Sequence, residues 1–265
     1  MPDVKLAVTI DGAQHAPDAP VLVLANPIGT TMGIWRHQVP VLSRYFRVIR
    51  FEHRGHGVPG AQSPAPRGPY SMAELGADVL GLLSALGVER AAFAGVSLGG
   101  MVGIWLAANA PERISSLAVI CAALVPLPSA QSWRDRAATV RGGGMEPIVD
   151  TVVPRGFPPA FLAACPGEVA GVAGMLRATS PAGYAGCGDA IAAMDLRPLL
   201  PAIKAPTLVI SGAEDLAAPP PQGALTARGI KDSRLTVIRG ASHFAHFQAP
   251  GPVTNALVTH FQAAR

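Results

Sequence analysis

The stretch AGVSLGGM, Ala94–Met101, places a single serine among three glycines. Gly95 and Gly99 lie two residues on either side of Ser97, which is the pattern G-x-S-x-G. An apolar run typical of a buried strand precedes it, and a helical pattern follows it. A sharp strand-to-helix turn holds its serine at positive φ and accepts only small neighbours, because the chain doubles back on itself. The stretch therefore predicts a nucleophile elbow. The alternative is that the glycines only let a helix pack closely on a sheet.

Short apolar runs bounded by turn residues alternate with helical patterns along most of the chain. This alternation predicts an α/β fold, in which a mostly parallel, doubly wound sheet carries helices on both faces. The helix expected over 71–86 begins with a capping box formed by Ser71 and Glu74. The predicted strands are Val21–Ala25, Phe46–Phe51, Ala91–Val96, Ser116–Ala122, Pro206–Gly212 and Arg234–Gly240.

The alternation fails between about residues 125 and 201, where prolines and alanine-rich helical stretches such as 159–164 and 169–178 replace the strands. We expect a helical insertion there, which would lie over the carboxyl ends of the strands, where open parallel sheets bind ligands. The expected organisation is a core formed by residues 1–124 and 202–265, with residues 125–201 as a helical lid.

Composition limits the classes of partner. Hydrophobic residues make up 49% of the 265 residues and charged residues 14%, as is typical of a packed globular protein. The net charge of +4 comes from lysines and arginines scattered singly along the chain, so nucleic acid is not an expected partner. The three cysteines are widely spaced and have no zinc-site spacing, so we expect buried thiols in a reducing compartment and no metal.

The uncharged run Ala91–Ala110 is long enough for a transmembrane helix. Glycines interrupt it at four positions, and a strand followed by a buried helix explains the same pattern. The first twelve residues lack the pattern of a signal peptide. We therefore expect a cytoplasmic protein that does not bind a membrane.

A serine hydroxyl becomes a good nucleophile only beside a general base that an acid orients. Asp215 follows one predicted strand and His243 follows the next, which gives the chain order Ser97, Asp215, His243. Asp215 would hold the imidazole tautomer, while His243 would take the serine proton and later activate water. Glu214 is the alternative acid, and His246 is the alternative base.

Such chemistry also needs backbone amides that bind the developing oxyanion. One donor should be the amide of Leu98, the residue after the nucleophile. The second should come from the loop NPIGTT at 26–31, where Ile28 is the better candidate because Pro27 has no N–H. An ordinary turn is the alternative explanation of this loop.

Together these stretches resemble the α/β-hydrolases and, within them, the 3-oxoadipate enol-lactonases. The elbow and RGHG at 54–57 are shared with many α/β-hydrolases, whereas GYAGC at 183–187 and MDLRP at 194–198 are more specific to the enol-lactonases. The resemblance covers nearly the whole chain. It implies the same triad and the same two amides, and it implies neither a metal nor an organic cofactor.

Trp133 and Arg136 resemble a W-x-x-R pattern in the lid of that family. Arg136 would pair with a substrate carboxylate, since a guanidinium binds a carboxylate through two hydrogen bonds. A surface arginine on a helix is the alternative interpretation.

The chain departs from the family pattern at several positions that we expect near the mouth of the pocket. Glu52 stands where the family typically has aspartate, and Pro27 stands where serine is usual. Phe244, His246 and Phe247 replace a more polar stretch. These changes favour a different acyl or lactone substrate as an alternative.

The sequence thus predicts a serine hydrolase that opens a small, possibly anionic, lactone or ester through an acyl-enzyme. The resemblance implies hydrolysis of 3-oxoadipate enol-lactone to 3-oxoadipate. The alternatives are a general carboxylesterase or another lactonase, a cofactor-free haloperoxidase, and a ligand-binding module without catalysis. The sequence predicts no particular oligomeric state.

Overall fold

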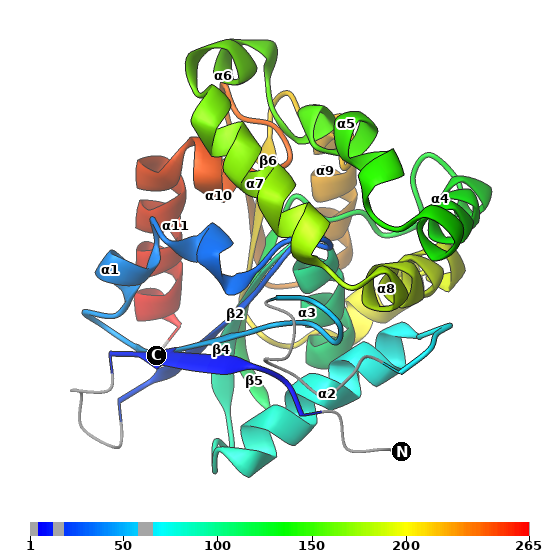
Figure 1. The fold of residues 1–265 in the computed structure, drawn as a ribbon. Coiled ribbons are helices and arrows are strands. Elements are labelled where there is room, and N and C mark those ends of the chain that lie inside the picture. Colours follow the sequence, from blue (N-terminus) through cyan, green and yellow to red (C-terminus); the bar gives the residue numbers. More distant parts are fainter. Residues whose placement is uncertain (1–4, 13–18, 58–65, 265) are drawn as a thin grey trace.

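The computed structural model describes residues 5–12, 19–57 and 66–264. Within them, seven strands form one sheet in the order β1-β3-β2-β4-β5-β6-β7 (Figure 1). Every neighbouring pair is parallel except β1 and β3, which are antiparallel. The predicted α/β class is therefore confirmed. The strands are β1 (Val8–Asp11), β2 (Val21–Ala25), β3 (Arg47–Phe51), β4 (Ala91–Val96), β5 (Ile114–Ile120), β6 (Thr207–Gly212) and β7 (Ser233–Ile238).

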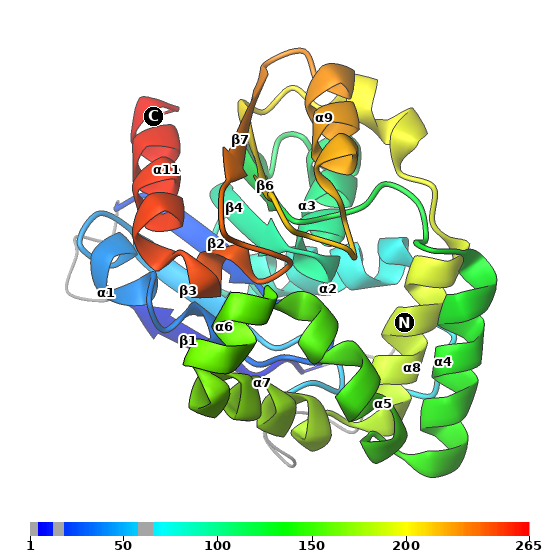
Figure 2. The same ribbon diagram turned by 90° about the horizontal axis from the view of Figure 1, so that it is seen from above.

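Helices cover both faces of the sheet, with α1 and α11 on one face and α2, α3 and α9 on the other (Figures 1 and 2). Strand β2 shows why both faces are apolar, because Leu22 and Leu24 enter one core and Val23 and Ala25 enter the other. The helices outside the segment between β5 and β6 are η1 (Met32–Trp35), α1 (Val39–Leu42), α2 (Met72–Ala85), α3 (Leu98–Asn109), η3 (Arg197–Ala202), α9 (Pro220–Gly229), α10 (Ala245–Gln248) and α11 (Pro250–Ala263).

The run Ala91–Ala110 is strand β4, the elbow serine and helix α3, and not one long helix. No helix in the described part of the chain has the length and apolar character needed to cross a membrane. Of the cysteines, Cys121 and Cys187 are buried, but Cys165 is partly exposed, and all three are free thiols. The expectation that all three are buried was therefore wrong for Cys165, which caps the short helix α6 (Pro159–Ala164).

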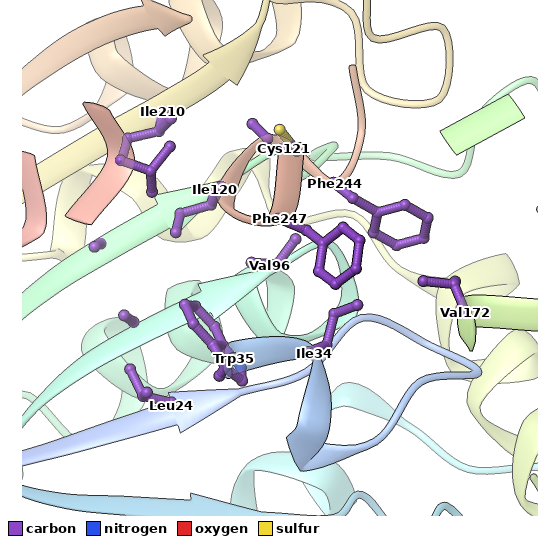
Figure 3. Close-up of a cluster of buried hydrophobic side chains, with 14 of the residues drawn as sticks. Leu24, Ile34, Trp35, Val96, Ile120, Cys121, Val172, Ile210, Phe244 and Phe247 are labelled. Atoms are coloured by element: carbon purple, nitrogen blue, oxygen red, sulfur yellow. The ribbon is translucent and has the colours of Figure 1, made fainter. Parts of the chain in front are cut away.

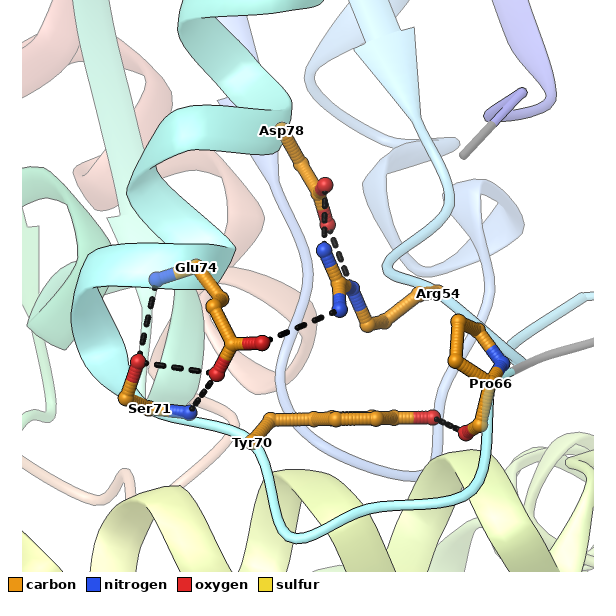
Figure 4. Close-up of polar contacts among 6 residues, drawn as sticks. All are labelled: Arg54, Pro66, Tyr70, Ser71, Glu74 and Asp78. Carbon is orange, nitrogen blue, oxygen red and sulfur yellow. Dashed lines mark hydrogen bonds and ion pairs between the residues drawn. The ribbon is translucent and has the colours of Figure 1, made fainter. Parts of the chain in front are cut away.

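Helix α2 begins as its sequence predicts, because the Ser71 side chain accepts from the amide of Glu74 and the Glu74 carboxylate accepts from the amide of Ser71 (Figure 4). A second contact fixes this helix to the turn after β3. Arg54 donates from Nε to Asp78 Oδ2 at 2.7 Å, and its guanidinium lies 4.8 Å from the centre of the Tyr70 ring. These charge-assisted contacts hold the turn after β3 against α2.

The turn between β4 and α3 has the strained geometry that its glycines predict. Ser97 has φ 53° and ψ −116°. A Cβ atom on Gly95 would lie 2.2 Å from the carbonyl oxygen of Gly99, and one on Gly99 would lie 2.3 Å from the carbonyl oxygen of Ala25. Helix and sheet therefore approach so closely that only glycine fits between them.

The segment between β5 and β6 is helical, and none of residues 125–201 lies in a strand. Two of its helices, α4 and α8, pack along each other beside the sheet (Figure 2). Phe157 packs on Phe244 at 5.1 Å between ring centres, and Arg36 pairs with Glu168, so contacts at two places join the segment to the core. Its helices are α4 (Ala130–Gly143), α5 (Glu146–Val152), η2 (Pro154–Gly156), α6 (Pro159–Ala164), α7 (Pro166–Ala178) and α8 (Pro181–Ala193).

The close approach of α3 to β2 at the elbow predicts how a substitution of Gly99 changes the free energy of unfolding. Gly99→Ala should lower the free energy of unfolding by about 3 kcal/mol or more, because the new methyl group forces α3 away from β2. Gly171→Ala on α7 is the matched control, since nothing lies within 4 Å of a Cβ there. It should raise the free energy of unfolding by roughly 0.5–1 kcal/mol, as helix propensity predicts. Urea unfolding followed by circular dichroism measures both, and similar values for the two variants would contradict the packing described.

Candidate active site

Ser97 lies at the carboxyl end of β4 and is almost fully buried. Its amide donates to the carbonyl of Ile120 at 2.9 Å, which extends the pairing of β4 with β5 as far as the serine. Helix α3 begins at the next residue, Leu98, so the positive end of the helix lies beside the serine. The strained turn therefore fixes both the serine and the first amide of the helix.

Asp215 and His243 form a hydrogen-bonded pair. Nδ1 of His243 lies 2.9 Å from Oδ2 of Asp215, and Oδ1 of Asp215 accepts from the amides of Ala217 at 2.8 Å and Ala218 at 2.9 Å. Burial alone would raise the pKa of Asp215, but His243 and these two amides outweigh it and hold that pKa below its usual value. An ionised Asp215 places the ring proton on Nδ1 and leaves Nε2 of His243 for a second partner.

A cavity of about 300 Å³ brings the predicted site residues together. Ser97 and His243 both line it, and Asp215 lies behind His243 and outside the lining. Residues from the segment between β5 and β6 form part of the wall. The remaining lining residues are Pro27, Ile28, Met101, Ala123, Val125, Leu127, Pro128, Trp133, Arg136, Val152, Arg155, Gly156, Ile191, Leu216, Ala217, Ala218, Pro219 and Phe244.

The structure places the two predicted amide donors at or next to this cavity. Ile28 is one of its lining residues, and Leu98 directly follows the lining residue Ser97. Among the described residues, neither amide donates a hydrogen bond to another part of the chain. An unpaired N–H beside a cavity is available to a ligand oxygen.

The alternative acid and base lie elsewhere. Glu214 is exposed, whereas its neighbour Asp215 is buried against His243. His246 is fully buried, does not line the cavity and has its ring centre 4.7 Å from that of Trp35. Burial lowers the pKa of His246 to about 3, which leaves it a neutral core residue.

The cavity also presents positive charge. The guanidinium of Arg136 lies 4.5 Å from the centre of the Trp133 ring, whose Nε1 donates to the carbonyl of Leu127 at 3.0 Å. Arg155 of η2, an exposed residue that no sequence motif marks, is a second arginine in the lining. The described lining contains two arginines and no carboxylate.

The departures from the family pattern divide into two groups. Pro27 and Phe244 line the cavity, as expected. Glu52, His246 and Phe247 are not among its lining residues. Phe244 and Phe247 belong to the apolar cluster between the core and α7 (Figure 3), which explains the loss of polarity after His243. In the part of the chain that the structure describes, no three His, Cys, Asp or Glu side chains form a cluster suited to a metal.

Comparison with known proteins agrees with this geometry. Residues 20–144 match the alpha/beta hydrolase fold family. The 3-oxoadipate enol-lactonase 2 of Acinetobacter baylyi is 37% identical over 91% of this chain and 88% of the relative. The chain belongs to the α/β-hydrolase family. The 3-oxoadipate enol-lactonase 1 of the same organism is 32% identical over 92% of this hydrolase and 88% of the relative.

A solved structure extends the likeness to the whole hydrolase. The enol-lactonase from Burkholderia xenovorans LB400 superposes with a TM-score of 0.93 and is 39% identical. The match covers 98% of this chain and 97% of the other. The segment between β5 and β6 is therefore included in the matched fold.

The raised pKa of Glu52 in this hydrolase predicts that the free energy of unfolding depends on pH. Burial raises its pKa from 4.5 to about 7, although hydrogen bonds from Met32 and Asn26, and the charge of Arg50, act in the opposite direction. Between pH 4.5 and about 7, Glu52 is therefore protonated in the folded protein and ionised in the unfolded chain. The contribution of Glu52 to the free energy of unfolding falls as the pH rises through this range.

Glu52→Gln cannot titrate, so its free energy of unfolding relative to wild type should increase by roughly 2–3 kcal/mol between about pH 5 and pH 8. Its lost hydrogen bonds add an offset that does not depend on pH. Urea unfolding of both proteins at several pH values measures the difference. A difference that stays constant across this range would show that Glu52 titrates normally.

Proposed function

We propose that this protein hydrolyses a small lactone or ester through an acyl-enzyme on Ser97. The observation that carries the proposal is the convergence of the strained Ser97 and the Asp215–His243 pair on one cavity. A ligand-binding module has no need of this combination, since the strained turn and the oriented imidazole serve to activate a hydroxyl.

The first half of the reaction forms the acyl-enzyme. Nε2 of His243 accepts the proton of Ser97 as Oγ attacks the carbonyl carbon, and Asp215 stabilises the resulting imidazolium. The carbonyl oxygen becomes an oxyanion that accepts from the amides of Ile28 and Leu98. Each such donor contributes on the order of 3 kcal/mol to transition-state stabilisation. When the tetrahedral intermediate collapses, the ring C–O bond breaks, and the enolate takes the proton from His243 and becomes a ketone.

The second half releases the product. His243 takes a proton from a water molecule, whose oxygen attacks the acyl carbon and forms a second oxyanion at the same two amides. Collapse breaks the bond to Ser97 Oγ, which regains its proton from His243. The product is an oxo acid, and no redox step or cofactor enters the balance.

We propose an enol-lactone of the 3-oxoadipate type as the substrate. The enol-lactonases named above support it, as do Arg136 and Arg155 in a lining without carboxylates. Residues 125–201 would act as a lid that supplies Trp133 and both arginines to the cavity. The three free thiols fit the proposed cytoplasmic location.

A neutral carboxylic ester is the second candidate. The apolar lining favours it, in particular Phe244, whose ring centre lies 5.7 Å from that of His243. An acyl chain would gain contact area there without needing a charged partner.

Turnover of 3-oxoadipate enol-lactone beside short p-nitrophenyl esters tests the proposal. Rapid ring opening with slow ester cleavage is expected, and the reverse result would favour the ester as substrate. Ser97→Ala should lower kcat by about 10³-fold or more on either substrate, because it removes the nucleophile. A Ser97→Ala variant with full activity on both would end the proposed mechanism.

Arg136→Gln tests the charge of the substrate. It should lower kcat/KM for the anionic enol-lactone by about 10–100-fold, since a charge-assisted pair is lost. Turnover of neutral p-nitrophenyl acetate should change little. Arg134→Gln is the matched control, because Arg134 lies on the same helix but is exposed and outside the lining. Equal losses on the two substrates would show that Arg136 only supports the fold of the lid.

A further inference from the structure

The loop between β2 and η1, residues 26–31, carries the amide of Ile28 and is named here the oxyanion loop. Asn26 is its first residue, and Met32 directly follows it. The carboxylate of Glu52 accepts at both ends, from Nδ2 of Asn26 to Oε2 at 3.1 Å and from the amide of Met32 to Oε1 at 2.9 Å. One side chain therefore joins the start of the loop to its end.

The first end of the loop is also fixed to the elbow. The carbonyl of Asn26 accepts from the amide of Gly99 at 3.1 Å and faces Nε2 of His53 at 3.0 Å. Nδ2 of Asn26 also donates to the carbonyl of Phe51 at 3.1 Å. The relative position of the loop and the Ser97 turn thus depends on contacts around Asn26 and Glu52.

Among the described residues, the hydrogen bonds found in the middle of the loop are local, although Ile28 also packs against the core and Gly29 lies against Leu176 and Tyr184. The amide and the hydroxyl of Thr30 donate to the carbonyl of Pro27 at 3.3 and 2.9 Å, and Gly29 has φ 73°. These local hydrogen bonds do not join the loop to the serine turn. Hydrogen bonds at the two ends of the loop do so, and among the described residues Glu52 is the one side chain seen to accept at both ends.

Burial of Glu52 is unfavourable for its ionised form. Glu52 is 4% exposed, and its burial raises its pKa as described above. The charged group that faces it is Arg50 on β3, which is itself paired with Asp11 on β1 and donates to the carbonyl of Met32 at 3.2 Å. A Cβ on Gly57 would lie 2.7 Å from Cγ of Glu52, so glycine leaves the room that the side chain needs.

We propose that Glu52 is a positioning residue that clamps both ends of the oxyanion loop and thereby aims the Ile28 amide at the oxyanion formed on Ser97. The inference rests on the proposed function, since the amide has this role only if Ser97 is acylated. Glu52 does not line the cavity and acts through the Asn26 side chain and the Met32 amide.

Two variants remove the clamp from opposite sides. Glu52→Leu removes both acceptor oxygens and keeps a side chain of similar size. Met32→Pro keeps the carboxylate but deletes the N–H that donates to it, along with the methionine side chain. Proline fits the first position of η1, because the preceding Thr31 is extended, with φ −116° and ψ 170°. Met32→Leu is the matched control with the N–H intact, and Asp78→Asn controls for the loss of a partly buried carboxylate outside the cavity lining.

The measurements are the rate at which a fluorophosphonate labels Ser97, kcat and KM for p-nitrophenyl acetate, and inhibition by an alkyl trifluoromethyl ketone and by acetate, the product acid. Both clamp variants should label and turn over about 10–100-fold more slowly, with KM changed by less than about twofold. They should bind the ketone, which forms an oxyanion, about tenfold or more weakly and acetate as before. Met32→Leu and Asp78→Asn should behave as wild type.

Hydrogen exchange adds a readout that needs no activity and no proline substitution. The Met32 amide should exchange faster in Glu52→Leu, which has no acceptor, than in wild type and in Asp78→Asn. Wild-type labelling rates in both clamp variants, or equal weakening of the ketone and acetate, would overturn the proposal, as would unchanged Met32 exchange. Failure of the phosphonate to label wild-type Ser97 would instead overturn the proposed function, and the clamp's catalytic role with it.

Discussion

The site depends on one strained residue. Ser97 takes a backbone conformation that costs on the order of 1–3 kcal/mol, and its surroundings leave no other. Its amide is bound to Ile120 and its carbonyl accepts from Met101 at 2.9 Å, while Gly95 and Gly99 let α3 lie against the sheet. Because strand and helix are both anchored, the hydroxyl and the Leu98 amide have fixed directions.

Sheet topology supplies the remaining groups. The oxyanion loop follows β2, Ser97 follows β4, Asp215 follows β6 and His243 follows β7. These strands are parallel, so their carboxyl ends lie on one edge of the sheet, and residues more than a hundred positions apart in the chain meet there. Strand β5 lies between β4, which precedes Ser97, and β6, which precedes Asp215. Cys121, directly after β5, also has positive φ, at 48°. The chain thus turns sharply after each of two adjacent strands at the site.

The sequence was sufficient for the central strands and for the candidate triad, because buried parallel strands read as continuous apolar runs and the elbow has a local glycine pattern. The predicted strands agree with the structure to within about two residues, as is usual for strand ends. Strand β1 was missed, since Val8–Asp11 is a short, partly exposed edge strand without an apolar run. The bounds of α4 and α8 were not predicted, because α4 is polar and α8 is rich in glycine and alanine.

Other features of the site could not be read from sequence for a physical reason. Arg155 lines the cavity from η2, and no periodic pattern in a sequence marks a short 3₁₀ helix. Glu52 was noticed as a departure, but its contacts with both ends of the oxyanion loop are set by how β2 and β3 pair. His246 follows His243 by three residues, so its position in the sequence leaves it as an alternative base, whereas its burial beside Trp35 separates the two.

The most direct measurement of the central claim is a crystal structure of the protein after reaction with a phosphonate ester. The account predicts a single adduct on Oγ of Ser97, with one phosphoryl oxygen about 2.7–3.1 Å from the amide nitrogens of both Ile28 and Leu98. Nε2 of His243 should lie within hydrogen-bond distance of Oγ or of a second phosphonate oxygen. An adduct on another residue, or a phosphoryl oxygen turned away from both amides, would contradict it.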